Sequence, residues 1–215
     1  MTPSYLSYRN LFARNCSRVQ LNVVIALFAL IILFPDGARS QTKASTPLEV
    51  DTATIAELAP LCREEVDEFE GITWIMPKYA SHSNKVDDIY AYFCVKDGKP
   101  YNLRLRIQIV SSDWLFVKKY IFLIDGKRME YTPARVERDF DSITWEWSDE
   151  KIKSSPQLKA LFAQMLKANE IKMRFVGKNY VRDRTLTSKE VAHLKEINAY
   201  FNALTPRRKA SQKPN

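Results

Sequence analysis

Basic and aromatic residues at alternate positions of predicted strands are the residues of this chain whose types and spacing could do chemistry. The candidates are Tyr90, Tyr92, Arg104, Arg106, Lys172 and Arg174. Arginine binds carboxylate or sulfate groups through two parallel hydrogen bonds, and a tyrosine ring stacks on a sugar or on a guanidinium plane. The pattern predicts a sheet face that binds an anionic ligand, either an anionic saccharide or an acidic protein. In the alternative interpretation the arginines are structural and pair with Glu137 or Glu146.

Carboxylates offer a second kind of chemistry. Asp139 with Asp141, or Glu146 with Asp149, could supply the acid and the base of a hydrolase. Glycoside hydrolysis requires two carboxyl groups that face each other across a cleft. Spacing along the chain does not establish that arrangement, because such residues also occupy solvated loops and strand edges. A carboxylate-dependent hydrolase acting outside the cytosol is therefore the alternative function.

Other catalytic classes lack their residues in this chain. It has two histidines, His82 in a polar loop and His193 at the edge of a helical stripe, and only five glycines. The motifs G-x-S-x-G, H-E-x-x-H, G-x-G-x-x-G and the P-loop are all missing from the sequence. Two histidines and one cysteine pair also make a zinc site improbable. We therefore predict no metal and no cofactor, and we favour a non-catalytic role.

The number of cysteines is compatible with one disulfide in an oxidising compartment. Cys16 lies in the N-terminal segment, which leaves Cys62 and Cys94 as an even pair. In an oxidising compartment such a pair favours a disulfide, which would stabilise the fold by about 3–4 kcal/mol in the chain-entropy account. The alternatives are two buried free thiols, or a catalytic pair formed by one cysteine and a histidine.

The N-terminus has the three parts of a secretory signal peptide. Residues 1–20 contain three arginines and no acidic residue, residues 21–34 are apolar except for Asn22, and the small-residue site Ala38-Arg39-Ser40 follows. As a helix the apolar run would span about 21 Å, which is short of a hydrocarbon core of about 30 Å. We therefore expect cleavage after Ser40 rather than an uncleaved anchor, and an exported protein that is periplasmic or secreted.

Removal of this segment changes the charge of the protein. The whole chain carries +8, and residues 1–40 contain four arginines and one aspartate, so +5 remains. Residues 205–215 contain four of the remaining basic residues and no acidic residue, which leaves the body close to neutral. A nucleic-acid-binding domain usually has a basic face, so we exclude nucleic acid as a partner. A membrane partner is expected only if the signal is uncleaved, or through the basic tail.

The order of predicted elements is typical of an α+β domain. A helix interrupted at Pro60 is expected at 51–71, with strands at 72–76, 89–95, 101–109, 114–124 and 143–147. The strand at 114–124 is expected to be covered on two sides. A helix at 155–166, strands at 171–175 and 180–186, and a last helix opened by the capping box of Thr187 and Glu190 follow. We predict a mostly antiparallel sheet, or two packed sheets, with an N-terminal helix and two late helices packed on it.

The Asp-Gly turn at residues 97–98 decides which side chains of one predicted hairpin share a face. A type I turn with a glycine bulge places Val95 opposite Lys99, and a two-residue turn places Lys96 there instead. The first register buries more apolar surface and keeps the two candidate arginines of this hairpin out of the core. We therefore expect the bulged turn, with those arginines and the two candidate tyrosines on one face.

Together these features divide the chain into a cleavable signal peptide (1–40), a flexible lead (41–50), one α+β domain (51–204) and a disordered basic tail (205–215). The expected function is that of an exported, non-catalytic β-rich domain with a binding or structural role in the cell envelope. Its partner would be an envelope or extracellular molecule.

Overall fold

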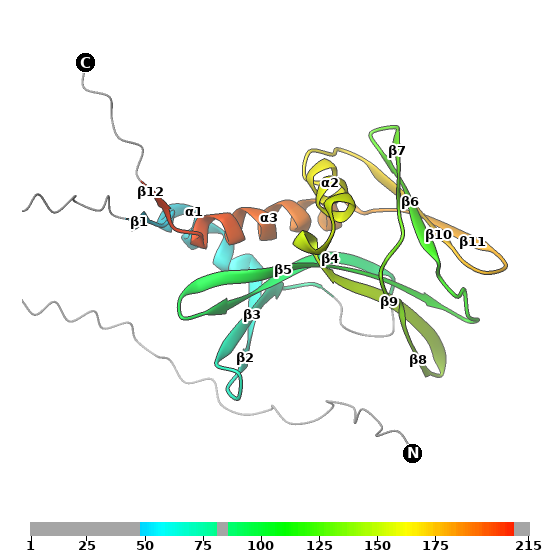
Figure 1. The fold of residues 1–215 in the computed structure, drawn as a ribbon, viewed down its shortest axis with the longest axis horizontal. Helices are drawn as coiled ribbons and strands as arrows, with labels where there is room; N and C mark the ends of the chain where they lie inside the picture. The colour runs from blue at the N-terminus through cyan, green and yellow to red at the C-terminus, as the bar shows by residue number, and fades with distance from the viewer. Residues whose placement is uncertain (1–47, 81–85, 209–215) are drawn as a thin grey trace, which may run out of the picture. The chain divides into compact units, whose positions relative to one another are not determined.

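Two large antiparallel sheets and three α-helices form the part of the chain that the computed structural model describes, residues 48–80 and 86–208 (Figure 1). The predicted α+β class with a mostly antiparallel sheet is confirmed, in its two-sheet form. The signal peptide expected at residues 1–40 lies outside the described residues. Of the predicted tail (205–215), Thr205 is the C-cap of the last helix, and Arg207 and Arg208 form a short strand that pairs with Leu48 and Glu49. Residues 209–215 lie outside the described residues.

The larger sheet has six strands in the order β2-β3-β4-β5-β9-β8. Their bounds are Cys62–Asp67 for β2, Ile72–Pro77 for β3, Asp88–Lys96 for β4, Lys99–Ser111 for β5, Ile143–Lys151 for β9 and Glu137–Asp141 for β8. The smaller sheet has four strands in the order β11 (Val181–Thr185), β10 (Ile171–Val176), β6 (Lys119–Ile124) and β7 (Lys127–Tyr131). The strands β1 (Leu48–Glu49) and β12 (Arg207–Arg208) form a separate pair.

Each α-helix begins at a side-chain cap. Helix α1 (Thr52–Leu58) is capped by the Asp51 carboxylate and continues into the 3-10 turn η1 (Ala59–Leu61). A second 3-10 turn, η2 (Ile152–Ser154), precedes α2 (Pro156–Met165), which is capped by Ser155. Helix α3 (Ser188–Leu204) begins at the predicted capping box of Thr187 and Glu190, which is confirmed. Within residues 48–80 and 86–208, no helix is long and apolar enough to cross a membrane.

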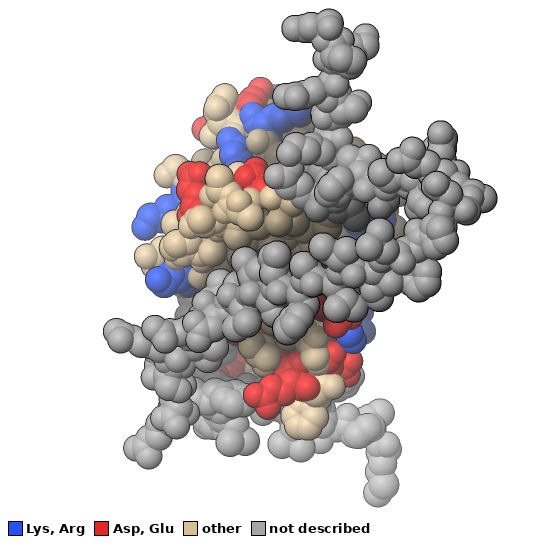
Figure 2. All heavy atoms as spheres, turned by 90° about the vertical axis from the view of Figure 1, so that its left-hand side faces the viewer, with Lys and Arg blue, Asp and Glu red and all other residues tan. Residues whose placement is uncertain are grey.

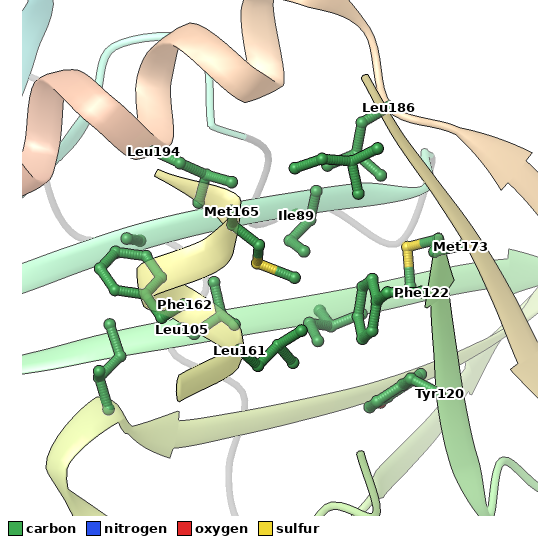
Figure 3. Packing of buried hydrophobic residues seen from close by; sticks show 14 of the residues in the cluster. Ile89, Leu105, Tyr120, Phe122, Leu161, Phe162, Met165, Met173, Leu186 and Leu194 are labelled. Atoms are coloured by element: carbon green, nitrogen blue, oxygen red, sulfur yellow. The ribbon is translucent and has the colours of Figure 1, made fainter. Parts of the chain in front are cut away.

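One hydrophobic core joins both sheets to α2 and α3. In the view of Figure 3, Phe162 and Met165 of α2 lie over the larger sheet, and Met165 is close to Ile89 of β4. Phe122 of β6 reaches the same core from the smaller sheet. All four side chains are buried, and full burial of each stabilises the fold by about 1.5–3 kcal/mol. This core occupies one face of each sheet. On the opposite face of the larger sheet, Tyr90 and Tyr92 form a second, smaller buried cluster with Met76 and Ala80.

The helix predicted at 51–71 is wrong beyond Leu58. Residues 62–67 form the edge strand β2, which pairs with β3 along its whole length. Pro60 stops α1 because proline lacks a backbone donor, and the ladder to β3 then satisfies the backbone groups that a helix would have paired internally. The apolar stripe is not buried, since Val66 is 64% exposed. Figure 2 shows acidic side chains gathered at the lower end of the view, over β2 and the turn that follows it.

In the hairpin of β4 and β5, the apolar residues face the core as expected, but the register of the two strands differs from the predicted one. A two-residue turn pairs Lys96 with Lys99, with Asp97 and Gly98 at positive φ, so the bulged turn predicted from the sequence is wrong. Farther along, the register shifts by one residue at Asn102, whose φ is 59°. This β-bulge returns the apolar residues of β5 to the core face, because one extra residue reverses the side to which the later residues point.

Residues 114–118 form a loop rather than the first half of a strand. The carboxylate of Glu146 accepts hydrogen bonds from the three consecutive backbone N–H groups of residues 115–117, at 2.7, 2.8 and 2.9 Å. Strand β6 begins only after this loop, and its Leu123 is 42% exposed. The prediction that this strand is covered on two sides is therefore wrong, since one face of the smaller sheet is open.

Candidate ligand-binding face

The face of the larger sheet that points away from the core carries the candidate site. Residues directly opposite each other on neighbouring strands share a face, so the ladders of β3, β4, β5 and β9 identify its members. We call this surface the aromatic face, formed by Trp74, Tyr90, Tyr92, Arg104, Arg106, Gln108, Trp145, Trp147 and Asp149. The even-numbered residues of β4 and β5 thus lie beside the odd-numbered residues of β9.

The structure brings together four of the residues that sequence alternation selects. Tyr90 lies directly opposite Arg106, and Tyr92 lies opposite Arg104. The two tyrosine rings are 6.0 Å apart, and Trp74 of β3 lies 5.6 Å from the ring of Tyr92. Burial raises the pKa of both tyrosines, so their hydroxyl groups stay protonated and act as neutral hydrogen-bonding groups at physiological pH.

Asp149 fixes the Arg104 side of this face. The Tyr92 hydroxyl donates a 2.6 Å hydrogen bond to the Asp149 carboxylate, and Arg104 Nε donates one of 2.7 Å. A guanidinium nitrogen of Arg104 also donates to the backbone oxygen of Asp149 at 2.8 Å. Burial alone would lower the pKa of Arg104, but the hydrogen bond and charge of Asp149 outweigh it and raise that pKa. This arginine is therefore held as a structural ion pair.

Arg106 is held differently, by aromatic rings. Its guanidinium carbon lies 5.3 Å from the ring centre of Trp145 and 5.0 Å from that of Trp147, and the two indole rings are 4.3 Å apart. Its hydrogen bonds are long, at 3.3 Å to Gln108 and 3.5 Å to Asp149. The residue is only 8% exposed. Stacking on indole rings stabilises the cation but leaves most of its N–H donors without a short hydrogen bond to a described residue.

Trp145 presents an additional donor. Its indole Nε1 is buried and makes no hydrogen bond within the described residues. A buried donor without an acceptor costs about 1–3 kcal/mol in folding. The two groups with unused donors, Trp145 and Arg106, lie on adjacent strands of the same face.

Lys172 and Arg174 do not belong to this face. They lie on β10 of the smaller sheet, on the side opposite the core. Arg174 donates two hydrogen bonds of 2.6 Å to the Asp183 carboxylate, and Lys172 lies 3.3 Å from Glu170. The residues that the sequence groups into one anion-binding surface are therefore divided between two surfaces.

The predicted disulfide between Cys62 and Cys94 is wrong, because both are free thiols. Cys62 pairs with Pro77 and Cys94 with Trp74, so the two cysteines flank β3 three residues apart along the strand. Strand geometry puts their Cα atoms about 14 Å apart, and the odd offset sends their side chains to opposite faces. A disulfide requires a separation of roughly 4.4–6.8 Å. Free thiols therefore replace the disulfide as the state of this pair.

The carboxylates do not form a catalytic pair. The side chains of Glu146 and Asp149 point to opposite faces of β9, because the two residues are three positions apart on the strand. Asp139 and Asp141 are exposed and lie two positions apart on one side of the edge strand β8. His193 stacks on the exposed Tyr79, with the ring centres 6.2 Å apart, and His82 lies outside the described residues. In residues 48–80 and 86–208, no cluster of three potential ligands could hold a metal ion.

Comparisons with protein-family models, with curated proteins and with solved structures returned no match to this chain. The assignment of function therefore depends on the geometry of the aromatic face.

Sequence reasoning missed five members of that face, namely Trp74, Gln108, Trp145, Trp147 and Asp149. Trp145, Trp147 and Asp149 stand at alternate positions, which was a usable signal for one shared side of a strand. The sequence did not show which side of β9 meets the core. That choice follows from the ladder to β5, in which Trp147 lies opposite Gln108.

Proposed function

We propose that this protein is an exported, non-catalytic domain that binds an anionic saccharide on its aromatic face, in a binding or structural role in the cell envelope. The observation that carries the proposal is the environment of Arg106. Its guanidinium is stacked on two indole rings, nearly buried, and bonded to described residues only at 3.3 and 3.5 Å. An anion can complete its hydrogen bonding without displacing a short ion pair.

The charges of the face support an anion as the ligand. Two guanidinium groups lie close to one carboxylate, and Arg104 makes the short hydrogen bonds to it. The register adds Asp88, opposite Gln108, and Lys151, opposite Arg104, to this face. These two charges cancel, so one positive charge is left near Arg106. Hydrogen bonds between ionised partners are roughly twice as strong as neutral ones, and low local polarity strengthens them further. A carboxylate or sulfate group would therefore gain more from Arg106 than from an exposed arginine.

The aromatic rings support a saccharide rather than an acidic protein. Trp145 and Trp147 are partly exposed, and indole rings offer the flat apolar surface on which sugar rings stack. The edge strand β8 places Glu137 opposite Trp147 and Asp139 opposite Trp145. These carboxylates border the face, so a broad acidic surface would meet like charges there. A single acidic group on a sugar would reach Arg106 without meeting them.

Calorimetric titration tests the proposal with defined oligosaccharides. The protein produced from the full-length gene is titrated with a maltooligosaccharide that carries one terminal uronic acid, and with the neutral maltooligosaccharide of equal length. We expect the acidic oligomer to bind at least tenfold more tightly, with affinity that falls as salt rises. Arg106→Gln should lower that affinity at least tenfold. Lys159→Gln is the control, because Lys159 is exposed on α2 and lies outside the aromatic face.

Two outcomes contradict the proposal. One is equal affinity for the acidic and neutral oligomers, and the other is unchanged binding by Arg106→Gln. Binding of polyglutamate alone would assign the face to an acidic protein instead. Because Arg106 is nearly buried, Arg106→Lys serves as a second variant that keeps the charge but removes the planar fork, and thermal unfolding shows whether each variant is folded.

Export has its own test. The protein recovered from outside the cytosol should have the mass of a chain that begins after Ser40. A mass that retains residues 1–40 would contradict cleavage and would add a membrane tether to the binding role.

A further inference from the structure

The open face of the smaller sheet contains a hollow of about 510 Å³. Its lining includes Ile121, Leu123, Arg128, Lys172, Arg174 and Asp183. This volume lies within the range of about 300–1,000 Å³ that is usual for pockets that hold small molecules. The hollow shares no residue with the aromatic face, so its chemistry has to be explained separately.

The floor of the hollow is apolar. Ile121 and Leu123 occupy alternate positions of β6 and point away from the core, whereas Phe122 between them is fully buried. Leu123 is 42% exposed although it stands in an interior strand of the sheet. Two apolar side chains side by side on an open sheet face provide a track along which a hydrocarbon chain would be removed from water.

Two cations flank the outer end of this track. The register places Lys172 on one side of Leu123 and Arg128 on the other. Neighbouring strands are about 4.8 Å apart, so both long side chains can converge on a group placed over Leu123. Lys172 has an exposed partner, Glu170, at 3.3 Å, and Arg128 pairs with Glu130, which Lys119 also binds at 2.8 Å. Exposed pairs of this kind contribute little and exchange partners readily.

At the Ile121 end of the track, the nearby cation is already neutralised by a carboxylate. Arg174, which lies opposite Ile121, is held by Asp183 through two hydrogen bonds of 2.6 Å. The hydrogen bond from Arg174 lowers the pKa of Asp183, so the carboxylate stays ionised and the pair stays intact at neutral pH. An acidic group would therefore gain most at the Leu123 end, and the apolar part of a ligand would lie toward Ile121.

We propose that this hollow binds a single-chain anionic amphiphile. Its acidic headgroup lies between Lys172 and Arg128, and its alkyl chain lies over Leu123 and Ile121. The proposal needs both halves of the ligand, since the cations alone are exposed and already paired, and the floor alone is small.

The test is a titration of the protein from the full-length gene with dodecanoate below its micelle concentration, followed by amide chemical shifts. Dodecyl maltoside supplies the chain without the charge, and acetate supplies the charge without the chain. We expect dodecanoate to shift amides of β6, β7 and β10 and to bind at least tenfold more tightly than either control. Leu123→Ser and Lys172→Gln should each weaken binding about fivefold or more. Lys159→Gln, an exposed lysine of α2, is the matched control.

Equal binding of dodecyl maltoside, unchanged binding by Leu123→Ser, or shifts confined to the aromatic face would each overturn the assignment. Leu123, Lys172 and Lys159 are exposed, so their variants should fold, and thermal unfolding verifies the fold of every variant. Arg106→Gln should leave dodecanoate binding unchanged, which separates failure of this proposal from failure of the saccharide proposal.

Discussion

Glu146 on β9 accepts a 2.7 Å hydrogen bond from the backbone N–H of Leu115, a residue of the loop between β5 and β6. The same carboxylate accepts the N–H groups of Phe116 and Val117 and lies 3.1 Å from Arg138 Nε, although it is only 2% exposed. One buried charge thus organises the whole loop, and it holds Phe116 at a φ of 52° that a phenylalanine seldom adopts.

Replacement of Glu146 by glutamine should destabilise the fold. The amide removes the negative charge and turns two donors toward backbone N–H groups that need acceptors, which costs about 2–4 kcal/mol. The free energy of unfolding in urea measures the loss. Glu57→Gln is the control, because Glu57 is exposed on α1 and should change that free energy by less than about 0.5 kcal/mol. Equal stabilities of the two variants would show that the loop does not depend on Glu146.

Gly177→Ala should destabilise the protein through a close approach of two segments. A Cβ atom at this position would lie 2.1 Å from the backbone oxygen of Leu115, so the loop or the strand must move. We expect a loss of about 2 kcal/mol or more in thermal or urea unfolding. Gly98→Ala provides the comparison, because nothing lies within 4 Å of its added Cβ and only the positive φ opposes it, at a cost of about 1 kcal/mol. The reverse order of the two losses would contradict the packing of this loop.

The two thiols should be unreactive in the folded protein and both reactive after unfolding without reductant. Burial raises the pKa of Cys62 to about 12, so little thiolate is present at pH 8. Burial favours the neutral thiol of Cys62. The contribution of this buried thiol to the free energy of unfolding is therefore complete below about pH 9, and it is lost as the pH rises toward 12. Alkylation followed by peptide mapping checks this at Cys62 and Cys94. If alkylation of the unfolded protein required a reductant, the two cysteines would be joined by a disulfide after all.

Asp149→Asn should change stability and ligand binding in opposite directions. It removes the charge that holds Arg104 and the strong acceptor of the Tyr92 hydroxyl, which costs about 1–3 kcal/mol in unfolding. The same change removes the carboxylate that pairs with both arginines of the face, so the singly acidic maltooligosaccharide should bind more tightly by a factor of about three to ten. Calorimetry of the folded variant measures the affinity. Weaker binding would show that Asp149 contacts the ligand or shapes its site.

The parts of the fold that local patterns determine could be predicted from the sequence. The capping box at Thr187, the cap at Ser155 and the alternation along Tyr101–Ile109 each fix an element through neighbours in the chain. The shared face of Arg104 and Arg106 was likewise predictable, because alternation along one strand depends only on strand period. That Tyr92 lies beside them depends on the register of β4 and β5, which was predicted wrongly.

The remaining features depend on partners distant in the chain. Residues 62–67 carry a helical apolar stripe, but pairing with β3 makes them a strand. The bulge at Asn102 and the loop around Glu146 need contacts that no local pattern shows. The disulfide prediction rested on an even number of cysteines and an expected oxidising compartment, whereas the sheet places Cys62 and Cys94 on opposite faces. Tertiary pairing overrides local propensity at each of these positions.

The pairing of β1 with β12 brings the two ends of the described chain next to each other. Leu48 lies opposite Arg208 and Glu49 opposite Arg207, so the first and last described strands run side by side in opposite directions (Figure 1). A short linker could therefore join residue 208 to residue 48 without disturbing either sheet, and new termini could be opened in the exposed turn between β2 and β3. We therefore expect a circularly permuted chain to form the same two sheets. The aromatic face and the hollow on the smaller sheet should then both be retained.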